Sequence, residues 1–336
     1  MRNVKNVWIS NACNWALSKA LDSPNVKPSP IELEKAVKNE TELLGFRECH
    51  IEDAVAVCKY LNWLEEELNS GREISECQGA DKLEALRRES KMCVGLSFDT
   101  ISGAGPNGAI IHYKPEPSTC RLITREEMYL CDSGGQYYNG TTDITRTVHF
   151  NPQVASEHEK TCFTLVLKGV IQLARSVFPA YTKGIQLDVL ARHNLWRHGL
   201  DYRHGTGHGV GHFLNVHEGP QSISFRSMGP QDVSLQPGMT VTDEPGYYED
   251  GKFGIRIENV LVVRRCEEIS DRGFGLFNCF ETVTVVPIQR ELILKSLLAE
   301  EEIAWLDEYH QKCWSLLSER LDEGTKAWLF KATRPI

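Results

Sequence analysis

The strongest constraint on the fold of this chain is a pair of carboxylates set in strand-like runs on either side of one turn-rich connection. Asp132 ends the apolar run MYLCD, and Asp143 lies eleven residues later in the β-branched run TTDITRTV. Aspartate is depleted in strands, and burial of a carboxylate costs free energy unless a partner compensates its charge. The connection GGQYYNG is rich in turn residues, so we expect the two runs to form a hairpin.

Such a hairpin would bring Asp132 and Asp143 side by side. The alternation of side chains along a strand places Asp143 on one face together with Thr141, Thr145 and Thr147. Two neighbouring carboxylates repel one another, and one of them stays protonated unless a cation lies between them. The alternative interpretation is a pair of strand-end or capping aspartates that never meet, and these residues alone leave both interpretations open.

A second signal is the segment RHGTGHGVGHFLNVHEGP, residues 203–220, which contains four histidines. The interleaved glycines disfavour a helix, and the pattern is not the H-E-x-x-H of helical zinc proteases. The segment therefore predicts a strand or loop that passes close to a site. For any one of these histidines, a place in a flexible surface loop is the better interpretation. The four are His204, His208, His212 and His217.

A third signal is the segment TVTDEPGYYEDGKFGIRIENVLVV, residues 240–263. Glu244 ends an apolar strand just before Pro-Gly, and Glu258 lies inside the apolar run GIRIENVLVV. Alternation places Arg256 and Glu258 on one strand face, so an ordinary Arg256–Glu258 ion pair is one interpretation. The sharper interpretation is that Glu258 faces a metal ion.

Together these segments supply four carboxylates at strand positions and one histidine-rich segment. Oxygen-rich ligation with a single imidazole suits Mn, Co, Fe or Zn in a paired site and does not suit a structural Cys-type zinc. Two cations bridged by carboxylates form the general two-metal hydrolytic site. The sequence therefore predicts a two-metal hydrolase.

The periodicity of the chain predicts helices and strands mixed in a single α/β or α+β domain. Apolar residues recur at steps of three and four over about 41–69, which predicts one long amphipathic helix, and a second helix is expected near 79–89. Helices are also expected at about 155–178 and 185–199 and over the last forty residues. Strands are expected at CVGLSF, GAIIHY, MYLCD, the Asp143 run, MTVTDE, GIRIENVLVV and ETVTVVPI.

The composition indicates which partners the protein lacks and in which cell compartment it is expected. The net charge is −9 and no strongly basic block occurs, which argues against nucleic acid as a partner. Eleven cysteines without a C-x-x-C pair argue against a disulfide scaffold or a zinc knuckle and favour reduced thiols. The first 22 residues lack the apolar core of a signal peptide, and no run approaches the roughly 18 apolar residues of a membrane span. We therefore expect a cytoplasmic protein without a membrane partner.

At this point the motifs are recognisable as a set. The runs DSGGQYYNGTTDITRT, HGTGHGVG, VHEGP, TDEPGYY and GIRIENV resemble the metallopeptidases of the pita-bread fold, and most closely the cytosolic Xaa-Pro aminopeptidases. The resemblance runs from about residue 30 to the C-terminus. It implies a curved, mostly antiparallel sheet with helices on its outer face. It also implies removal of the first residue from peptides with proline at the second position.

The resemblance assigns roles to individual residues. Asp132 and Asp143 match metal ligands, with His208 and Glu244 on one metal and Glu258 bridging two. Glu244 would double as the general base that takes a proton from a hydroxide bridging the metals. The remaining matches are substrate-binding residues. His112 matches the histidine that contacts the substrate and stabilises the tetrahedral intermediate. Of His204 and His217, one would line the proline pocket and one would assist proton transfer, and Arg256 and Tyr248 match residues beside the metals. His212 and His149 match nothing.

The resemblance also implies two divalent metal ions per chain, with Mn expected and Co or Zn as alternatives, proline-containing peptides as substrates, and a homodimer. Cytosolic family members carry two further domains before this one. Here residues 1–30 resemble the tail of the second of these domains followed by a linker, and 31–336 would form the pita-bread catalytic domain. The chain is therefore expected to be a piece of a longer enzyme, an engineered piece or a natural short form.

Three rival functions remain open. The first is another hydrolase of the same fold, a prolidase or a methionine aminopeptidase. The second is the metal-free creatine amidinohydrolase branch, against which the five intact ligand positions argue. The third is a metal-free pita-bread protein that acts as a protein-interaction module, and such proteins normally show substituted ligand positions. The 14-residue gap from Glu244 to Glu258 and the HGTGHGVG and VHEGP motifs favour the Xaa-Pro branch.

Overall fold

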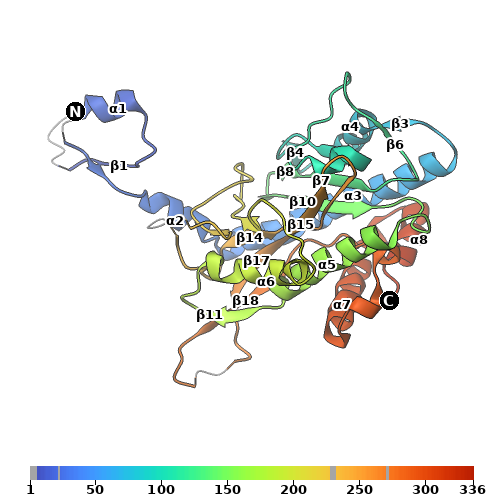
Figure 1. The fold of residues 1–336 in the computed structure, drawn as a ribbon. Coiled ribbons are helices and arrows are strands. Elements are labelled where there is room, and N and C mark those ends of the chain that lie inside the picture. Colours follow the sequence, from blue (N-terminus) through green and yellow to red (C-terminus); the bar gives the residue numbers. More distant parts are fainter. Residues whose placement is uncertain (1–5, 22, 228–231, 270–271) are drawn as a thin grey trace.

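A computed structural model describes residues 6–21, 23–227, 232–269 and 272–336 (Figure 1). Eight α-helices lie in the described part of the chain, and four short 3-10 turns accompany them. The α-helices are α1 (Trp15–Ala20), α2 (Pro30–Ala36), α3 (Glu40–Asn69), α4 (Glu76–Arg87), α5 (Glu157–Ala174), α6 (Gly184–Trp196), α7 (Glu300–Leu317) and α8 (Glu323–Ala332). The 3-10 turns are η1 (Gly105–Ala109), η3 (Arg290–Leu292), η4 (Lys295–Leu297) and η5 (Ser318–Arg320).

The strands form several small sheets, and among the described residues every strand pair except β1–β2 is antiparallel. The four-stranded sheet runs β11 (Val177–Pro179), β18 (Phe277–Thr282), β17 (Asn259–Arg265), β14 (Thr240–Asp243). The three-stranded sheets run β10 (Ile144–Val148), β7 (Tyr129–Ser133), β5 (Ile101–Ala104) and β4 (Cys93–Leu96), β8 (Gly135–Tyr137), β9 (Gly140–Thr141). The two-stranded pairs are β1 (Trp8–Ile9) with β2 (Asn25–Val26), β3 (Ile74–Ser75) with β6 (Leu122–Ile123), β12 (Gly207–His208) with β13 (Ser222–Ile223), and β15 (Gly246–Glu249) with β16 (Phe253–Arg256).

The long helix α3 begins and packs as its sequence indicates. Asn39 caps its N-terminus in a capping box with Glu42, which satisfies backbone groups that the first turn leaves without partners. The apolar stripe of α3 is buried in two clusters. Leu43 and Phe46 pack in a small cluster with residues of β17, and the stripe from Ala54 to Leu68 lies in the main core, where α3 meets α4, α7 and α8. The predicted helix over 41–69 is therefore confirmed.

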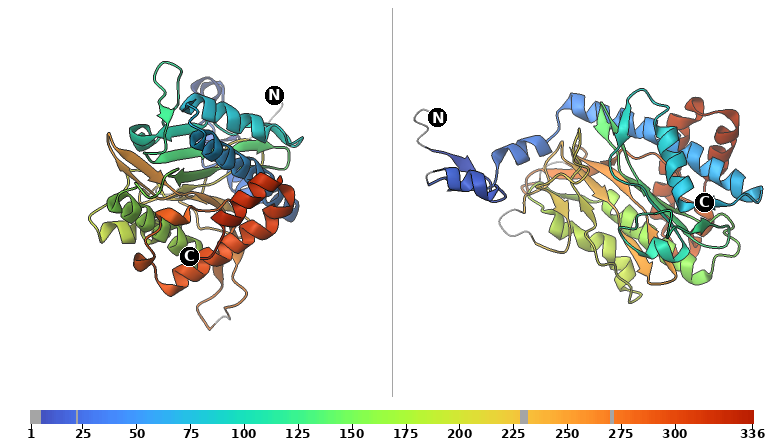
Figure 2. Two further views of the ribbon diagram at one scale, coloured as in Figure 1. Left: turned by 90° about the vertical axis from the view of Figure 1, so that its right-hand side faces the viewer. Right: turned by 90° about the horizontal axis from the view of Figure 1, so that it is seen from above.

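The strands lie between two groups of helices, as Figures 1 and 2 show from different sides. Helices α3 and α4 cover one side, and α5 and α6 pack against each other on the other side. Helices α7 and α8, drawn in red, close one end. The N-terminal segment with β1, α1 and β2 projects away from this body, and several of its large apolar side chains are exposed, among them Trp8 and Trp15.

Three predicted strands differ from the structure. The run GAIIHY is not a strand, because Gly105–Ala109 form the turn η1 and Ile111 and His112 lie in the turn that follows. The run GIRIENVLVV is broken into β16 and β17 at Ile257 and Glu258, and its two halves pair with different strands. In ETVTVVPI only the first two residues belong to β18, and the rest of the run is extended without regular pairing.

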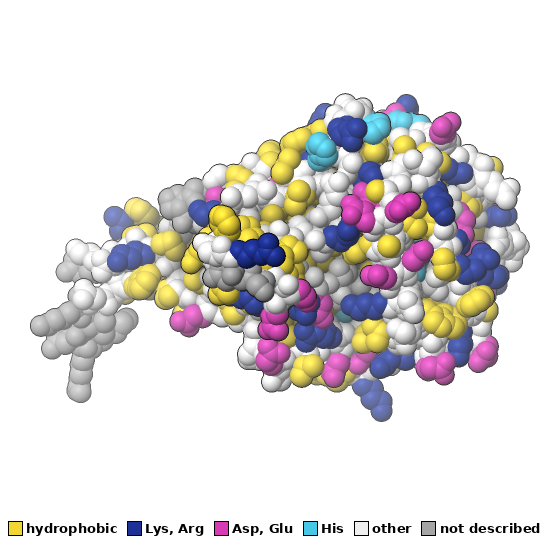
Figure 3. Space-filling model, turned by 90° about the horizontal axis from the view of Figure 1, so that it is seen from below, with side chains coloured by type: hydrophobic (Ala, Val, Ile, Leu, Met, Phe, Trp, Pro, Cys, Tyr) yellow, Lys and Arg dark blue, Asp and Glu magenta, His cyan; other side chains and the backbone are white. Residues whose placement is uncertain are grey.

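The surface carries a mixture of charges. Figure 3 shows Lys and Arg side chains interspersed with Asp and Glu side chains over the face seen from below. Each of the eleven cysteines has a free thiol. Within the described residues, none of the helices combines the length and apolar character that crossing a bilayer requires.

Candidate metal centre

The five side chains predicted as ligands come from five different places in the sheets. Asp132 lies in β7 and His208 in β12, while Glu244 directly follows β14. Asp143 was expected within a strand, but it lies in the gap between β9 and β10, and Glu258 lies in the gap between β16 and β17. In the gaps, Asp143 and Glu258 are free of the strict alternation of a ladder, so they can converge with Asp132, which is paired within β7.

The predicted pairing of the two strands is confirmed. Strand β7 pairs with β10 so that Asp132 lies opposite Thr145 and Ser133 lies opposite Ile144. The connecting residues form a second hairpin, β8–β9, which joins another sheet and leaves Asp143 at the junction. The backbone N–H of Glu258 donates to the carbonyl of Thr145 at 3.1 Å, and this bond places the broken strand beside β10.

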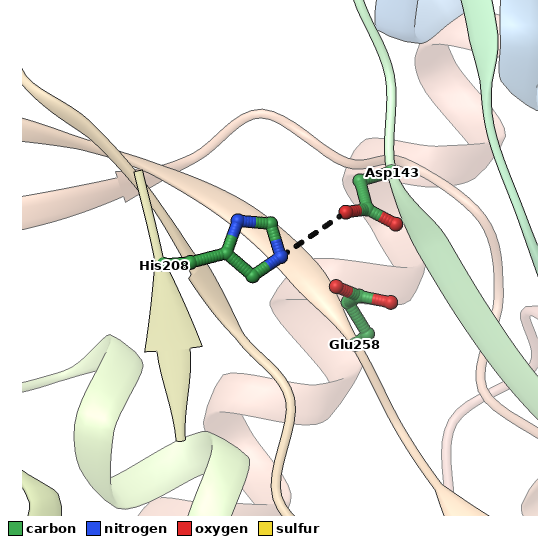
Figure 4. A group of neighbouring side chains, drawn as sticks. All are labelled: Asp143, His208 and Glu258. Atoms are coloured by element: carbon green, nitrogen blue, oxygen red, sulfur yellow. Dashed lines mark ion pairs between the residues drawn. The ribbon is translucent and has the colours of Figure 1, made fainter. Parts of the chain in front are cut away.

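Asp143, His208 and Glu258 lie together at one point (Figure 4). Each offers one ligand atom, and these atoms all lie within 4.8 Å of one another. Nε2 of His208 is 3.4 Å from Oδ2 of Asp143 and 3.5 Å from Oε1 of Glu244. Four of the five predicted ligands, Asp143, His208, Glu244 and Glu258, therefore lie close together.

Asp132, the fifth predicted ligand, is held by an arginine. Nη2 of Arg256 donates to Oδ2 of Asp132, whereas Oδ1 is buried without a hydrogen-bond partner among the described residues. The same guanidinium donates from Nη1 to the hydroxyl of Tyr248 at 2.6 Å and from Nε to Thr145 at 3.1 Å. The interpretation that Arg256 serves as the ion-pair partner of Glu258 is wrong, because its ion pair is with Asp132.

A positive charge would stabilise the ionised form of the carboxylates in this group. Burial raises the pKa of Asp143 to about 6 and that of Glu244 to about 7, and it raises the pKa of Glu258 well above its usual range. The neighbouring carboxylates add to each of these shifts. Burial alone would lower the pKa of His208, but its contact with Asp143 and the nearby Glu244 raise it to about 9. So many buried carboxylates ionise together only around a cation.

The donor set therefore fits divalent metal ions. It offers carboxylate oxygens and one imidazole, the ligands that Mn, Co and Zn accept in hydrolytic sites. Nδ1 of His208 lies 3.0 Å from the carbonyl of Gly209, which leaves Nε2 to face the carboxylates. The buried Oδ1 of Asp132 supplies a further oxygen that lacks a partner.

The remaining predicted histidines lie beside this centre. Nε2 of His204 lies 2.9 Å from the hydroxyl of Tyr248, and burial lowers the pKa of His204 to about 3. The ring of His217 contacts that of His208 edge-on with centroids 4.1 Å apart, and partial burial of this exposed side chain together with His208 lowers the pKa of His217 to about 4. His112 is exposed, yet its ring is near enough to lower the pKa of both His204 and His217.

Two histidines without a predicted role remain outside the centre. The carbonyl of His212 accepts a bond from Thr141. His149 is buried, and its backbone is bonded on both sides by the amide of Gln289. Neither side chain joins the group of ligands.

Sequence reasoning missed several residues that support the ligands. Thr145 donates to Oε2 of Glu258 at 2.7 Å, and the hydroxyl of Thr242 donates to Oε1 of Glu244 at 3.1 Å while it accepts from the N–H of His208. The signal for both was spacing, because each lies two positions from a predicted ligand. Asp243 gave no signal. It is fully buried, neither of its carboxylate oxygens has a partner among the described residues, and burial raises its pKa well above the usual range.

Arg146 fixes the backbone beneath Glu258. Its guanidinium is buried and donates from Nη1 to the carbonyl of Glu258 at 2.7 Å. Nη2 of the same group donates to Asn259, to the carbonyl of Val286 and to the hydroxyl of Tyr309 in α7. The C-terminal helices are thereby tied to the ligand group through one side chain.

The chain resembles known proteins over almost its whole length. Residues 45–265 match the model of metallopeptidase family M24, and residues 276–336 match the model of the C-terminal region of peptidase M24. A curated protein of Laccaria bicolor, "Probable Xaa-Pro aminopeptidase P", is 52% identical over 334 residues, which are 98% of this chain and 52% of that protein. One of Talaromyces marneffei with the same name is 53% identical over 336 residues, which cover 97% of this chain and 50% of that protein. The chain thus spans about half the length of the curated relatives it matches.

Solved structures show the same likeness. An X-prolyl aminopeptidase from Caenorhabditis elegans, described as a cytosolic enzyme with a di-nuclear active site, superposes with a TM-score of 0.92 at 41% identity. The match covers 98% of this chain and 54% of that one. A Xaa-Pro dipeptidase from Bacillus anthracis superposes with a TM-score of 0.66 at 25% identity, over 84% of this chain and 73% of that one.

Proposed function

Because the chain belongs to metallopeptidase family M24, we propose that it is the catalytic part of a dinuclear metal-dependent aminopeptidase that removes the N-terminal residue from peptides with proline in second place. The observation that carries the proposal is the convergence of Asp143, His208 and Glu258 within 4.8 Å, with Glu244 at 3.5 Å from the same imidazole. The names of the curated relatives support the choice of Xaa-Pro peptides.

Two divalent cations would be held by Asp132, Asp143, His208, Glu244 and Glu258, with Glu258 between them. Mn is the proposed metal, and Co or Zn would suit the same donors. When bound, such ions lower the pKa of water toward neutrality and polarise a carbonyl oxygen. A di-nuclear site in the structurally similar worm enzyme supports the number of ions.

Glu244 is proposed as the general base and acid. Its carboxylate lies beside the imidazole of His208, where it could take up a proton and release one. Its Oε1 accepts a hydrogen bond from Thr242, which orients the carboxylate. It would accept a proton from the attacking water and deliver one to the proline nitrogen, which belongs to a tertiary amide and leaves well only when protonated.

The substrate-binding roles fall to side chains at the rim of the centre. His112 would donate to the oxygen of the scissile carbonyl as negative charge develops there. His204, whose Nε2 meets the hydroxyl of Tyr248, and His217, which meets His208, would line the proline pocket and assist proton transfer. Arg256 and Tyr248, joined by a hydrogen bond, would border the substrate on the side of Asp132.

The domain division extends this proposal. Residues 1–30 would be the end of a preceding domain and a linker, and residues 31–336 the catalytic domain, although positions 1–5 and 22 lie outside the described residues. The projecting β1–α1–β2 segment with its exposed tryptophans supports that division.

The worm enzyme is described as cytosolic, which supports a cytoplasmic location. A homodimer stays a prediction, which analytical ultracentrifugation would measure.

A prolidase is the second candidate, because the Bacillus anthracis structure described as a Xaa-Pro dipeptidase shares the fold. Methionine aminopeptidase activity and a metal-free interaction module are further alternatives. The module is disfavoured because all five ligand positions carry ligand residues.

Substrate length and metal dependence separate these candidates. The purified chain would be stripped with chelator and then assayed on an Arg-Pro-Pro peptide, an Ala-Pro dipeptide and a Met-Ala-Ser peptide, each with and without Mn²⁺. We expect metal-dependent release of arginine from the first peptide. Cleavage of the dipeptide alone would establish a prolidase, release of methionine alone a methionine aminopeptidase, and absence of bound metal with no cleavage an interaction module.

A further inference from the structure

Glu218 receives one lysine on each of its two carboxylate oxygens. Nζ of Lys35 lies 2.8 Å from Oε2, and Nζ of Lys38 lies 3.2 Å from Oε1. The two lysines differ in environment, because the side chain of Lys38 is 0% exposed whereas that of Lys35 is 53% exposed. Burial lowers the pKa of Lys38, and the charge of Glu218 opposes that shift. A buried pair of this kind is strongly disrupted when one partner is removed, since the other charge is left without compensation.

The carboxylate of Glu218 lies inside the turn of the loop that carries His217. The N–H of Glu218 donates to the carbonyl of Gly209 at 2.7 Å, and Gly211 donates to the carbonyl of Asn215 at 2.9 Å. A Cβ on Gly211 would lie only 2.8 Å from Oε2 of Glu218, so the carboxylate packs directly against this turn. The neighbours His217 and Glu218 thus have opposite environments: the first is exposed beside His208, and the second is buried.

This loop depends on support from outside itself. Leu214 and Asn215 adopt φ values of 63° and 54°, in the left-handed region that a bulky residue such as leucine rarely enters. Such a conformation persists when surrounding contacts fix it. Gln136 accepts from the N–H of Leu214 on one side of the loop, and the two lysines hold Glu218 on the other.

Lys38 is itself anchored beside the strand that leads to Glu244. It lies between α2 and α3, and its N–H donates to the carbonyl of Gly238 at 2.9 Å. Its neighbour Val37 forms a β-bridge with Met239, directly before β14. The ammonium group therefore projects from a backbone that is fixed to the body of the protein.

We propose that Lys38 and Glu218 are a positioning pair for His217, through which the segment that enters the catalytic fold holds the 211–218 loop at the candidate centre. The role at the centre rests on the proposed function of His217, whereas the support of the loop does not. Lys35 adds to the same carboxylate from a half-exposed position, so its contribution is the smaller of the two.

Hydrogen exchange read by mass spectrometry tests the support of the loop without an activity assay. Lys38→Met and Glu218→Gln should accelerate amide exchange in peptides that cover 211–218. The control is Lys59→Met, which removes a lysine from a partly exposed ion pair with Glu89 and should leave these peptides unchanged. Exchange in Lys38→Met and Glu218→Gln equal to that of the control would overturn the proposal.

Kinetics then test whether the pair acts through His217. Lys38→Met should lower kcat/KM on the Arg-Pro-Pro peptide by about tenfold or more with bound metal retained. In a His217→Ala background the same change should alter kcat/KM by less than about twofold, because the group being positioned is absent. Full additivity of the two changes would refute action through His217.

If Lys38→Met fails to fold, Glu218→Gln serves in the same double-mutant cycle. An inactive wild-type chain would refute the proposed function, and the exchange comparison would still decide the support of the loop.

Discussion

Nη2 of Arg256 lies 2.5 Å from Oδ2 of Asp132, and this contact leaves the second oxygen of the carboxylate buried without a hydrogen-bond partner among the described residues. The arginine thus fixes the orientation of a predicted ligand without occupying both of its oxygens. Its other two contacts, with Tyr248 and Thr145, fix the guanidinium in turn. Such partners behind a ligand tune the affinity of a metal site.

Arg256→Lys should therefore weaken metal binding. A lysine ammonium lacks the planar fork that reaches three partners at once. We expect the affinity for Mn²⁺ to fall by about 10- to 100-fold, measured by competition with a chelating indicator. Arg47→Lys is the matched control, because it alters a bidentate pair with Glu281 outside the centre. Equal affinities in the two variants would show that Arg256 does not orient Asp132.

Glu244→Gln should abolish peptide hydrolysis while metal still binds. The amide cannot accept the proton that a general base takes, and loss of such a group costs about 10² to 10⁴ in rate. Metal content would be measured by atomic emission and turnover by release of the N-terminal residue. Turnover at the wild-type rate would contradict the role assigned to Glu244.

His112→Ala should lower kcat by about 10²-fold or more, as removal of an oxyanion donor does. The control is His193→Ala, which changes an exposed histidine of α6. A change confined to KM would indicate that His112 binds the substrate without stabilising the transition state.

The stability that Asp143 and Glu244 contribute to the metal-free protein should fall as pH rises through about 6 to 7. The pKa of Asp143 is raised from 3.8 to about 6 and that of Glu244 from 4.5 to about 7. Groups with a raised folded-state pKa stabilise the fold fully below the unfolded pKa and lose that contribution as pH passes the folded value. In chelator, the contribution of these two carboxyls to Tm, measured against a variant that lacks both, should thus be higher at pH 5.5 than at pH 8.

Added Mn²⁺ should reverse that order, because it binds the ionised carboxylates and releases their protons. Scanning calorimetry at the two pH values measures both effects. The double variant Asp143→Asn, Glu244→Gln should flatten the pH dependence of the metal-free protein. A chelated wild-type protein that gains stability between pH 5.5 and 8 relative to the double variant would contradict this account.

The fold class could be predicted from sequence because its signals are local. The long helix over about 41–69 is predicted from the spacing of apolar residues alone, and the structure has α3 at Glu40–Asn69. The motif resemblance implied the pita-bread fold, which the match to family M24 and the solved relatives confirms. The carboxylate ligands were found because they lie in apolar runs, where burial of a charge without a partner costs free energy.

What the sequence could not supply depended on tertiary contacts. The run GIRIENVLVV reads as one strand, but Glu258 breaks it because its N–H bonds to Thr145 of another sheet. GAIIHY is apolar enough for a strand, yet Gly105 at φ 53° turns the chain into η1. The partner of Arg256 was misjudged for the same reason, since Asp132 is 124 positions away and no local pattern joins the two.

The bond network of Arg146 has a consequence for how this protein can be shortened or recombined. One guanidinium joins the carbonyl of Glu258 to the hydroxyl of Tyr309, so the last sixty residues are not a detachable cap. A truncation before α7 would leave the buried guanidinium of Arg146 without its tyrosine partner, directly behind Glu258. A chimera with another C-terminal region would need a tyrosine at the matching position. The smallest transplantable unit of this fold therefore extends at least to Tyr309 of α7.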